Sequence, residues 1–259
     1  MKLRFTFLLL CAALTSAFIF TACDDDEDAA VPSGDVTVNF NALYDGANLT
    51  VQSDVYDYPD GSELKVQLFQ YYVSDLELIP ANGGDAVQLS DILLVRYNNA
   101  QEDNVDSYEF NEIPAGEYTG IRYGLGVSPD LNSMDPNEFD ADFVLNDAEF
   151  WPGNARYVFA KIEATVDLEN DGTFDTGVSY HMGSNDIYST VTFNAPITVS
   201  ENGNTTLDIM ADVQKALAAS DTDFHDFSDE SQRIVHGGNQ AVAADIWERL
   251  GAQFTLSVR

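Results

Sequence analysis

Residues 64–79 read LKVQLFQYYVSDLELI, and this stretch decides the fold class. Apolar and polar side chains alternate over residues 64–69 and again over residues 73–79, and a pair of tyrosines joins the two runs. A period of two places successive side chains on opposite faces of a β-strand, and aromatic and β-branched residues suit that setting. The stretch therefore predicts strand structure with one face turned into a core.

The same alternation recurs along most of the chain, with turns rich in Gly, Asn and Asp between the runs. The further runs occupy residues 36–40, 92–97, 108–113, 118–127, 157–166, 174–181 and 190–199. Short strands at this spacing are typical of a sandwich. We expect an all-β fold, a two-sheet antiparallel sandwich formed by residues 35–259 as one domain.

The C-terminal part of the chain changes its pattern. Apolar residues at helical spacing predict a helix over residues 209–219 and a second over residues 240–250, with Asn239 as its N-cap and Gly251 as its stop. Residues 253–258 alternate again and predict a last strand. The sandwich therefore carries one or two C-terminal helices.

Charge excludes one class of partner. The 259 residues include 44 Asp and Glu but only 11 Lys and Arg, which gives a net charge of −33. A protein that binds nucleic acid needs basic side chains to displace the counterions of the phosphate backbone. Nucleic acid is therefore not an expected partner.

The N-terminus is typical of export. Lys2 and Arg4 precede an apolar run over residues 5–20, which is the pattern of a signal peptide and is short for a membrane-spanning helix. The run ends at residues 20–23 (FTAC), which resemble a bacterial lipobox, so we expect cleavage after residue 22 and lipidation of Cys23. The alternative is an ordinary secretory signal with an incidental cysteine. We expect an outer membrane lipoprotein on the periplasmic side or at the cell surface.

Five acidic residues follow the anchor at positions 24–28. Such a block is solvated and cannot fold on itself, so residues 23–34 are interpreted as an acidic tether. The block also resembles the acidic export signal that sends some bacterial lipoproteins to the cell surface, and a plain tether is the alternative.

Several segments, in order along the chain, resemble the MbnP-like family of copper-binding lipoproteins and periplasmic proteins related to the methanobactin partner MbnP. The matching segments are FQYYVSDLEL (69–78), IPAGEY (113–118), YGLGV (123–127), EFWPGNARYVF (149–159), YHMG (180–183) and HGGNQ (236–240). Two departures stand out: Glu149 replaces the usual methionine, and Arg156 stands where glycine is common. The resemblance implies a copper-handling protein with a β-sandwich fold.

The resemblance also implies a copper site at His181, His236 and Trp151. In the family, a di-haem peroxidase of the MbnH type can oxidise a tryptophan to kynurenine, and Trp151 is the matching position. Imidazole is a suitable copper ligand, whereas Met182 should point to the opposite face of its strand. The alternatives are that the histidines serve backbone hydrogen bonds and that Trp151 is a core aromatic.

A second metal hypothesis concerns Asp167, Glu169, Asp171 and Asp175, which surround Gly172. This spacing matches the first part of an EF-hand-type calcium loop, but Val178 stands where the bidentate glutamate belongs. The alternative is an acidic β-hairpin without an ion.

The sequence contains no Gly-x-Ser-x-Gly elbow, no cysteine after Cys23 and no His-Glu-x-x-His helix. We therefore expect no enzyme, although counting alone does not exclude a paired-carboxylate hydrolase. The first hypothesis is a lipid-anchored, exported copper-binding protein. The alternative is a cell-surface β-sandwich module with a calcium-type hairpin, which serves binding or structure.

Overall fold

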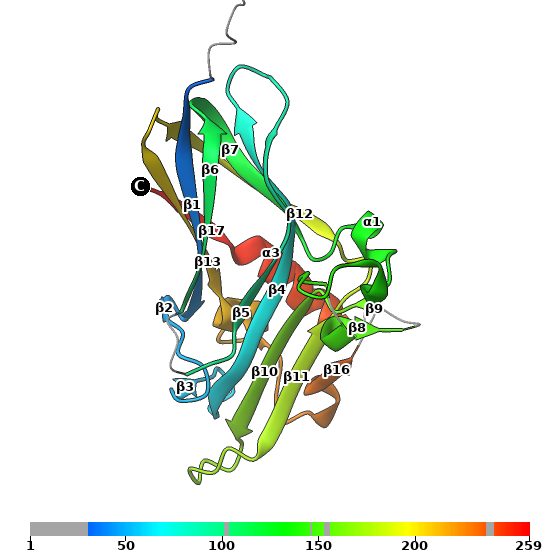
Figure 1. The fold of residues 1–259 in the computed structure, drawn as a ribbon. Coiled ribbons are helices and arrows are strands. Elements are labelled where there is room, and N and C mark those ends of the chain that lie inside the picture. The colour runs from blue at the N-terminus through cyan, green and yellow to red at the C-terminus, as the bar shows by residue number, and fades with distance from the viewer. Residues whose placement is uncertain (1–30, 101–103, 146, 153–155, 237–240) are drawn as a thin grey trace, which may run out of the picture. The chain divides into compact units, whose positions relative to one another are not determined.

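The stretch at residues 64–79 lies within the central strand, β4 (Glu63–Pro80). Residues 69–74 are all buried, whichever face of the sheet they point to, and they include the polar residues Gln70 and Ser74. β4 is long enough to pair with four other strands at different points: β3 (Tyr56–Asp57), β5 (Val87–Tyr97), β7 (Gly116–Leu125) and β10 (Ala160–Asp167). It is therefore the strand around which the larger sheet is organised (Figure 1).

The computed structural model describes residues 31–100, 104–145, 147–152, 156–236 and 241–259. Of these, Pro32–Arg259 form one compact unit. The predicted signal peptide, the lipidation site Cys23, the acidic block and the N-cap Asn239 lie outside the described residues. The first strand begins at Ser33, so it includes the last two residues of the predicted tether, 33 and 34.

Two main sheets make up the fold. The larger sheet follows the order β12 (Ser189–Val199), β7, β4, β10, β11 (Thr176–Met182), β16 (Ile234–His236). The smaller sheet follows the order β17 (Thr255–Val258), β13 (Asn204–Asp212), β1 (Ser33–Tyr44), β2 (Ala47–Asn48), and β6 (Val105–Pro114) also pairs with β1. Two hairpins complete the strands: β8 (Phe150–Trp151) with β9 (Arg156–Tyr157), and β14 (Ala218–Ser220) with β15 (Asp223–Phe224).

The core lies between the sheets. Phe40 of the smaller sheet contacts Tyr71 and Tyr123 of the larger sheet edge-on, with ring centroids 6.2 and 6.4 Å apart. Phe254 contacts the same two tyrosines at 5.4 and 5.9 Å. Edge-to-face packing at these distances is favourable beyond the burial of area. The predicted β-sandwich is confirmed, but its sheets are mixed, because β1 pairs with β13 and β11 pairs with β16 in parallel.

The helix expected over residues 209–219 is wrong at both ends, since residues 218 and 219 belong to β14. Residues 209–212 belong to β13, and only Val213–Leu217 form a helix, α2. β13 pairs with β1 over nine positions, among them Phe40 with Ile209. Backbone hydrogen bonds to a strand far away in the sequence therefore outweighed the local helical spacing.

The second predicted helix is present as α3 (Ala241–Gln253). It buries Ala243, Ile246, Trp247 and Leu250, and the Trp247 ring lies 6.0 Å from Phe159. Gly251 was expected to end this helix, which is wrong, because the helix continues for two residues beyond it. The helix is held at that point by its buried face, so the glycine need not act as a stop.

The remaining elements are short: α1 (Pro129–Asn132), η1 (Pro136–Glu138), η2 (Asp147–Glu149) and η3 (Glu230–Gln232). Three of these lie in the acidic segment at residues 129–149. Within the described part of the chain, no helix has the length and apolar character that a membrane crossing requires.

Candidate metal site

The parallel pairing of β11 with β16 brings two distant histidines together. His181 and His236 occupy the same register position of these neighbouring strands. Side chains at one register position point to the same face of a sheet. The two imidazole rings consequently stack, with centroids 4.8 Å apart and an angle of 17° between their planes.

Trp151 lies against both imidazole rings. Its indole contacts His181 edge-on at 5.3 Å and His236 at 5.4 Å, with interplanar angles of 63° and 80°. It belongs to the hairpin β8–β9, which lies beside the upper ends of β10 and β11 in Figure 1. The structure therefore gathers the three residues of the copper hypothesis into one half-buried cluster.

Arg156, opposite Trp151 in the hairpin, explains one departure from the family pattern. Its φ of +62° is a left-handed backbone conformation, which glycine adopts without strain. The guanidinium group offsets this strain by donating to the carbonyl oxygens of Asn132 (2.6 Å) and Ser133 (3.0 Å) and by pairing with Asp135 (2.8 Å). Arg156 thus ties the acidic segment to the hairpin that carries Trp151.

Glu149 explains the other departure. Its side chain is 3% exposed and its carboxylate pairs with Arg96 at 2.6 Å and with Lys161 at 2.7 Å. Its backbone oxygen also accepts a hydrogen bond from Val158. A buried carboxylate requires such partners. Glu149 therefore fastens the segment before Trp151 to the larger sheet. Sequence reasoning noted its position but did not predict this ion cluster.

The imidazole nitrogens of the histidine pair contact polar side chains of β10 and β11. Ser179 Oγ lies 3.2 Å from His181 Nε2 and 3.4 Å from His236 Nε2. Glu163 Oε1 lies 2.7 Å from His181 Nε2. Burial lowers the pKa of His181, and the hydrogen bond to Glu163 opposes this shift only in part. The neutral imidazole, which is the form that binds metals, is therefore favoured.

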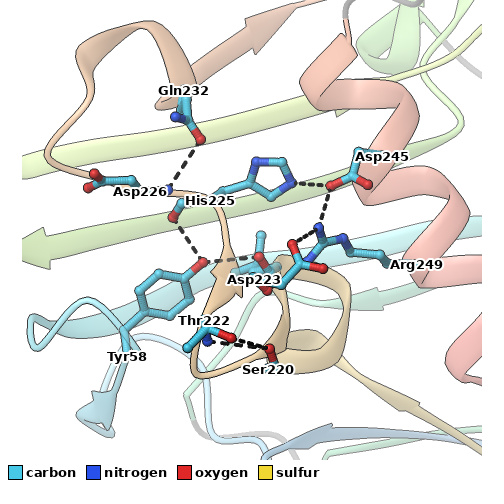
Figure 2. Close-up of polar contacts among 10 residues, drawn as sticks. Tyr58, Ser220, Thr222, Asp223, His225, Asp226, Gln232, Asp245 and Arg249 are labelled. Atoms are coloured by element: carbon cyan, nitrogen blue, oxygen red, sulfur yellow. Dashed lines mark hydrogen bonds and ion pairs between the residues drawn. The ribbon is translucent and has the colours of Figure 1, made fainter.

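Two further residues, Met182 and His225, lie outside the cluster. Met182 is fully buried in the core, so its thioether points away from the imidazoles, as predicted. His225, the third histidine, lies in a different environment: it is buried near Tyr180, and its Nε2 is 2.9 Å from Asp245 Oδ2 on α3 (Figure 2). Arg249 of the same helix contacts both Asp245 and Asp223, so this network joins α3 to β15.

The acidic hairpin between β10 and β11 uses its carboxylates on its own backbone. Buried Asp167 accepts hydrogen bonds from the amides of Asp171 (3.1 Å) and Gly172 (2.7 Å), whereas Glu169 and Asp175 are exposed. Across the described ranges, no group of three or more His, Cys, Asp and Glu side chains is arranged to hold a metal ion. The calcium hypothesis thus gains no support here and stays a prediction.

The absence of such a group among the described residues also applies to the histidine cluster, which brings together two imidazoles, those of His181 and His236. One observation fits a bound ion: His181 Nδ1 is buried and has no hydrogen-bond partner among the described residues. A buried polar atom without a partner is costly, so a bound ion would satisfy it. Imidazole donors suit copper.

Comparisons with known proteins agree on one family. A family model described as MbnP matches residues 33–236, a range that includes Trp151, His181 and His236. Among solved structures, MbnP from Methylosinus trichosporium superimposes with a TM-score of 0.55 at 15% identity, over 88% of this chain and 99% of that one. At this identity the likeness shows the fold alone. The search of curated proteins gave no match.

Proposed function

This chain belongs to the MbnP family, which is linked to copper and methanobactin, and on that premise we propose that it is an exported protein that binds copper through His181 and His236 beside Trp151. The observation that carries the proposal is the convergence of these three side chains from β11, β16 and β8. None of them is close to another in the sequence, so the fold itself builds the cluster.

The residues have distinct tasks in this proposal. His181, with a side chain 11% exposed, supplies a neutral nitrogen donor shielded from water, and exposed His236 supplies the second donor at the entrance. Trp151 covers both rings. Copper bound here would be a redox-active ion held by nitrogen ligands. Because Met182 faces the core, the strand itself contributes no thioether.

A third ligand would come from Trp151 after oxidation. We infer that a di-haem peroxidase of the MbnH type is the partner and that peroxide is its oxidant. Each of two peroxide equivalents transfers one oxygen atom to the indole and releases one water, so that the C2–C3 bond is cleaved to two carbonyl groups, and hydrolysis of the formyl group then releases formate and frees the aniline nitrogen of kynurenine. The support is positional: the indole lies against both imidazoles, so the product's nitrogen would be formed beside them.

The proposed location of the protein rests on its sequence alone. Lipidation of Cys23 would anchor the mature chain to the outer membrane, and the acidic tether would hold the sandwich away from it. Protease treatment of intact cells distinguishes the two faces of the membrane, because a sandwich at the cell surface would be digested and a periplasmic one would not.

The alternative function, a surface module with a calcium-type hairpin, finds no specific support, because Asp167 already binds two backbone amides. If millimolar calcium raises the melting temperature, and Asp171→Asn abolishes that rise, the alternative would gain.

The deciding experiment is metal analysis and intact-protein mass spectrometry on protein purified from its host. We expect bound copper and a mass shift on the Trp151 peptide that corresponds to kynurenine. His181→Ala should abolish copper uptake while near-UV circular dichroism stays unchanged. His225→Gln is the matched control, since it removes an imidazole outside the cluster and should leave copper uptake intact. Full copper uptake by His181→Ala would refute the proposal.

A further inference from the structure

The residue that contacts His181 most closely through a polar atom is Glu163, on the neighbouring strand β10. Glu163 and Lys161 are two positions apart on β10 and share a face of the sheet with His181. In the register, Lys161 is directly opposite His181, and Glu163 is opposite Ser179. Two charged groups of opposite sign therefore stand beside one imidazole.

These charged groups do not pair with each other. The Lys161 ammonium group pairs instead with the buried carboxylate of Glu149, at an N–O distance of 2.7 Å. The side chain of Lys161 is 12% exposed. Within the described residues, the ion pair of Glu163 is the one with His181. The Glu163 carboxylate is therefore left to accept a hydrogen bond from the imidazole of His181.

The contact determines where the proton of His181 resides. An ionised carboxylate only accepts hydrogen bonds, so Nε2, at 2.7 Å from Glu163 Oε1, carries the hydrogen. In a neutral imidazole the other nitrogen then bears the lone pair. That atom is Nδ1, which is buried without a partner in the described part of the chain.

We propose that Glu163 is the positioning residue of the copper site: its carboxylate holds His181 in the Nε2–H tautomer and thereby presents Nδ1 to the metal. The inference rests on the proposed function, because it assumes that His181 binds copper. A carboxylate behind a ligating histidine orients the ring and raises the basicity of the donor, and its loss lowers metal affinity about 10- to 100-fold.

The first measurement needs no copper. Metal-free protein labelled with ¹⁵N-histidine is examined by long-range ¹H–¹⁵N NMR, which distinguishes the two neutral tautomers. The resonances of His181 should show hydrogen on Nε2 in the wild type. In Glu163→Ala the two tautomers should become mixed. Hydrogen on Nδ1 in the wild type would overturn the inference.

The second measurement is the affinity for Cu⁺ buffered by a chelator. Glu163→Ala should bind Cu⁺ about 10- to 100-fold more weakly. Glu163→Gln keeps an oxygen acceptor without the charge, so the affinity of this variant for Cu⁺ should fall less than that of Glu163→Ala. Glu169→Gln, the same change at an exposed site in the adjacent hairpin, should bind like the wild type. Near-UV circular dichroism reports whether each variant keeps its fold.

The variants separate this inference from the function on which it rests. If His181→Ala loses Cu⁺ while Glu163→Ala binds as tightly as Glu169→Gln, the inference is wrong and the proposed function stands. If His181→Ala binds Cu⁺ like the wild type, the proposed function itself fails, and the inference with it.

Discussion

Gly183 Cα lies so close to the chain of β9 that a Cβ at this position would be 2.5 Å from the carbonyl oxygen of Tyr157. Tyr157 belongs to the hairpin that carries Trp151, and Gly183 follows the strand that carries His181. The absence of a side chain at Gly183 therefore permits the close approach of the tryptophan hairpin to the histidine pair.

Gly183→Ala should destabilise the protein by about 1–3 kcal/mol, because the added methyl group meets backbone atoms that cannot rotate away. Copper binding should weaken as well, since the hairpin has to shift from His181. Gly177→Ala on the same strand is the matched control, because a Cβ there meets no atom within 4 Å. Urea unfolding and Cu⁺ titration of both variants test this. Equal behaviour of the two would show that the close approach is unimportant.

Glu149→Gln should cost about 2–3 kcal/mol, because it leaves Arg96 and Lys161 next to a neutral amide in a nearly buried site. The lower end applies if water screens Arg96, which is 36% exposed. Glu77→Gln breaks the more exposed pair with Arg122 and should cost less than about 1 kcal/mol. The free energies of unfolding in urea are compared. A loss at Glu149 as small as that at Glu77 would contradict the buried-cluster interpretation.

Asp212 connects the turn after β1 to the start of α2. Its buried carboxylate accepts hydrogen bonds from the amides of Asp45 (3.1 Å), Gly46 (2.9 Å) and Gln214 (3.1 Å). Asp212→Ala should therefore cost about 2 kcal/mol or more, since it removes a helix cap and leaves buried amides unsatisfied. Asp229→Ala removes the exposed cap of η3 and should cost less. Thermal unfolding of the two variants provides the test.

Stability should fall in mild acid because of His225. Burial lowers the pKa of His225 below its ordinary value of 6.5, although Asp245 opposes the shift. The unfolded chain then binds the proton more readily than the folded one. This contribution to stability is complete above pH 6.5 and is lost as the pH falls from 6.5 toward the lowered folded pKa.

The free energy of unfolding, measured between pH 7.5 and pH 5, should decline less steeply in His225→Gln than in the wild type. Half-buried His181, whose pKa is also lowered, adds to the wild-type slope, so some decline should remain in the variant. Identical slopes would mean that His225 does not titrate differently in the two states.

The local sequence pattern predicted secondary structure correctly where interactions between neighbouring residues determine it. The alternation in residues 64–79 predicted strand structure, and β4 is the centre of the larger sheet. Local pattern failed at Ile209. Its neighbours have helical spacing, but Ile209 lies in a strand because it pairs with Phe40, which is far away in the sequence. No local signal indicates a parallel partner of that kind.

The histidine cluster shows the same division. Resemblance to a family singled out His181, His236 and Trp151, but it could not say that Glu163 would hold one imidazole or that Glu149 would draw Lys161 away. In a chain with 44 acidic residues, no spacing rule distinguishes these two carboxylates from the others. Burial and cross-strand register do so.

The amino-acid sequence alone determined the class of fold and supplied the candidate metal donors, because alternation and side-chain chemistry can be read from the chain without its partners. Tertiary structure alone decided that β11 and β16 run in parallel and in register, and hence that His181 and His236 stack beneath Trp151. Such pairing depends on backbone hydrogen bonds and packing between segments that are distant along the chain, and these have no signature in either segment by itself.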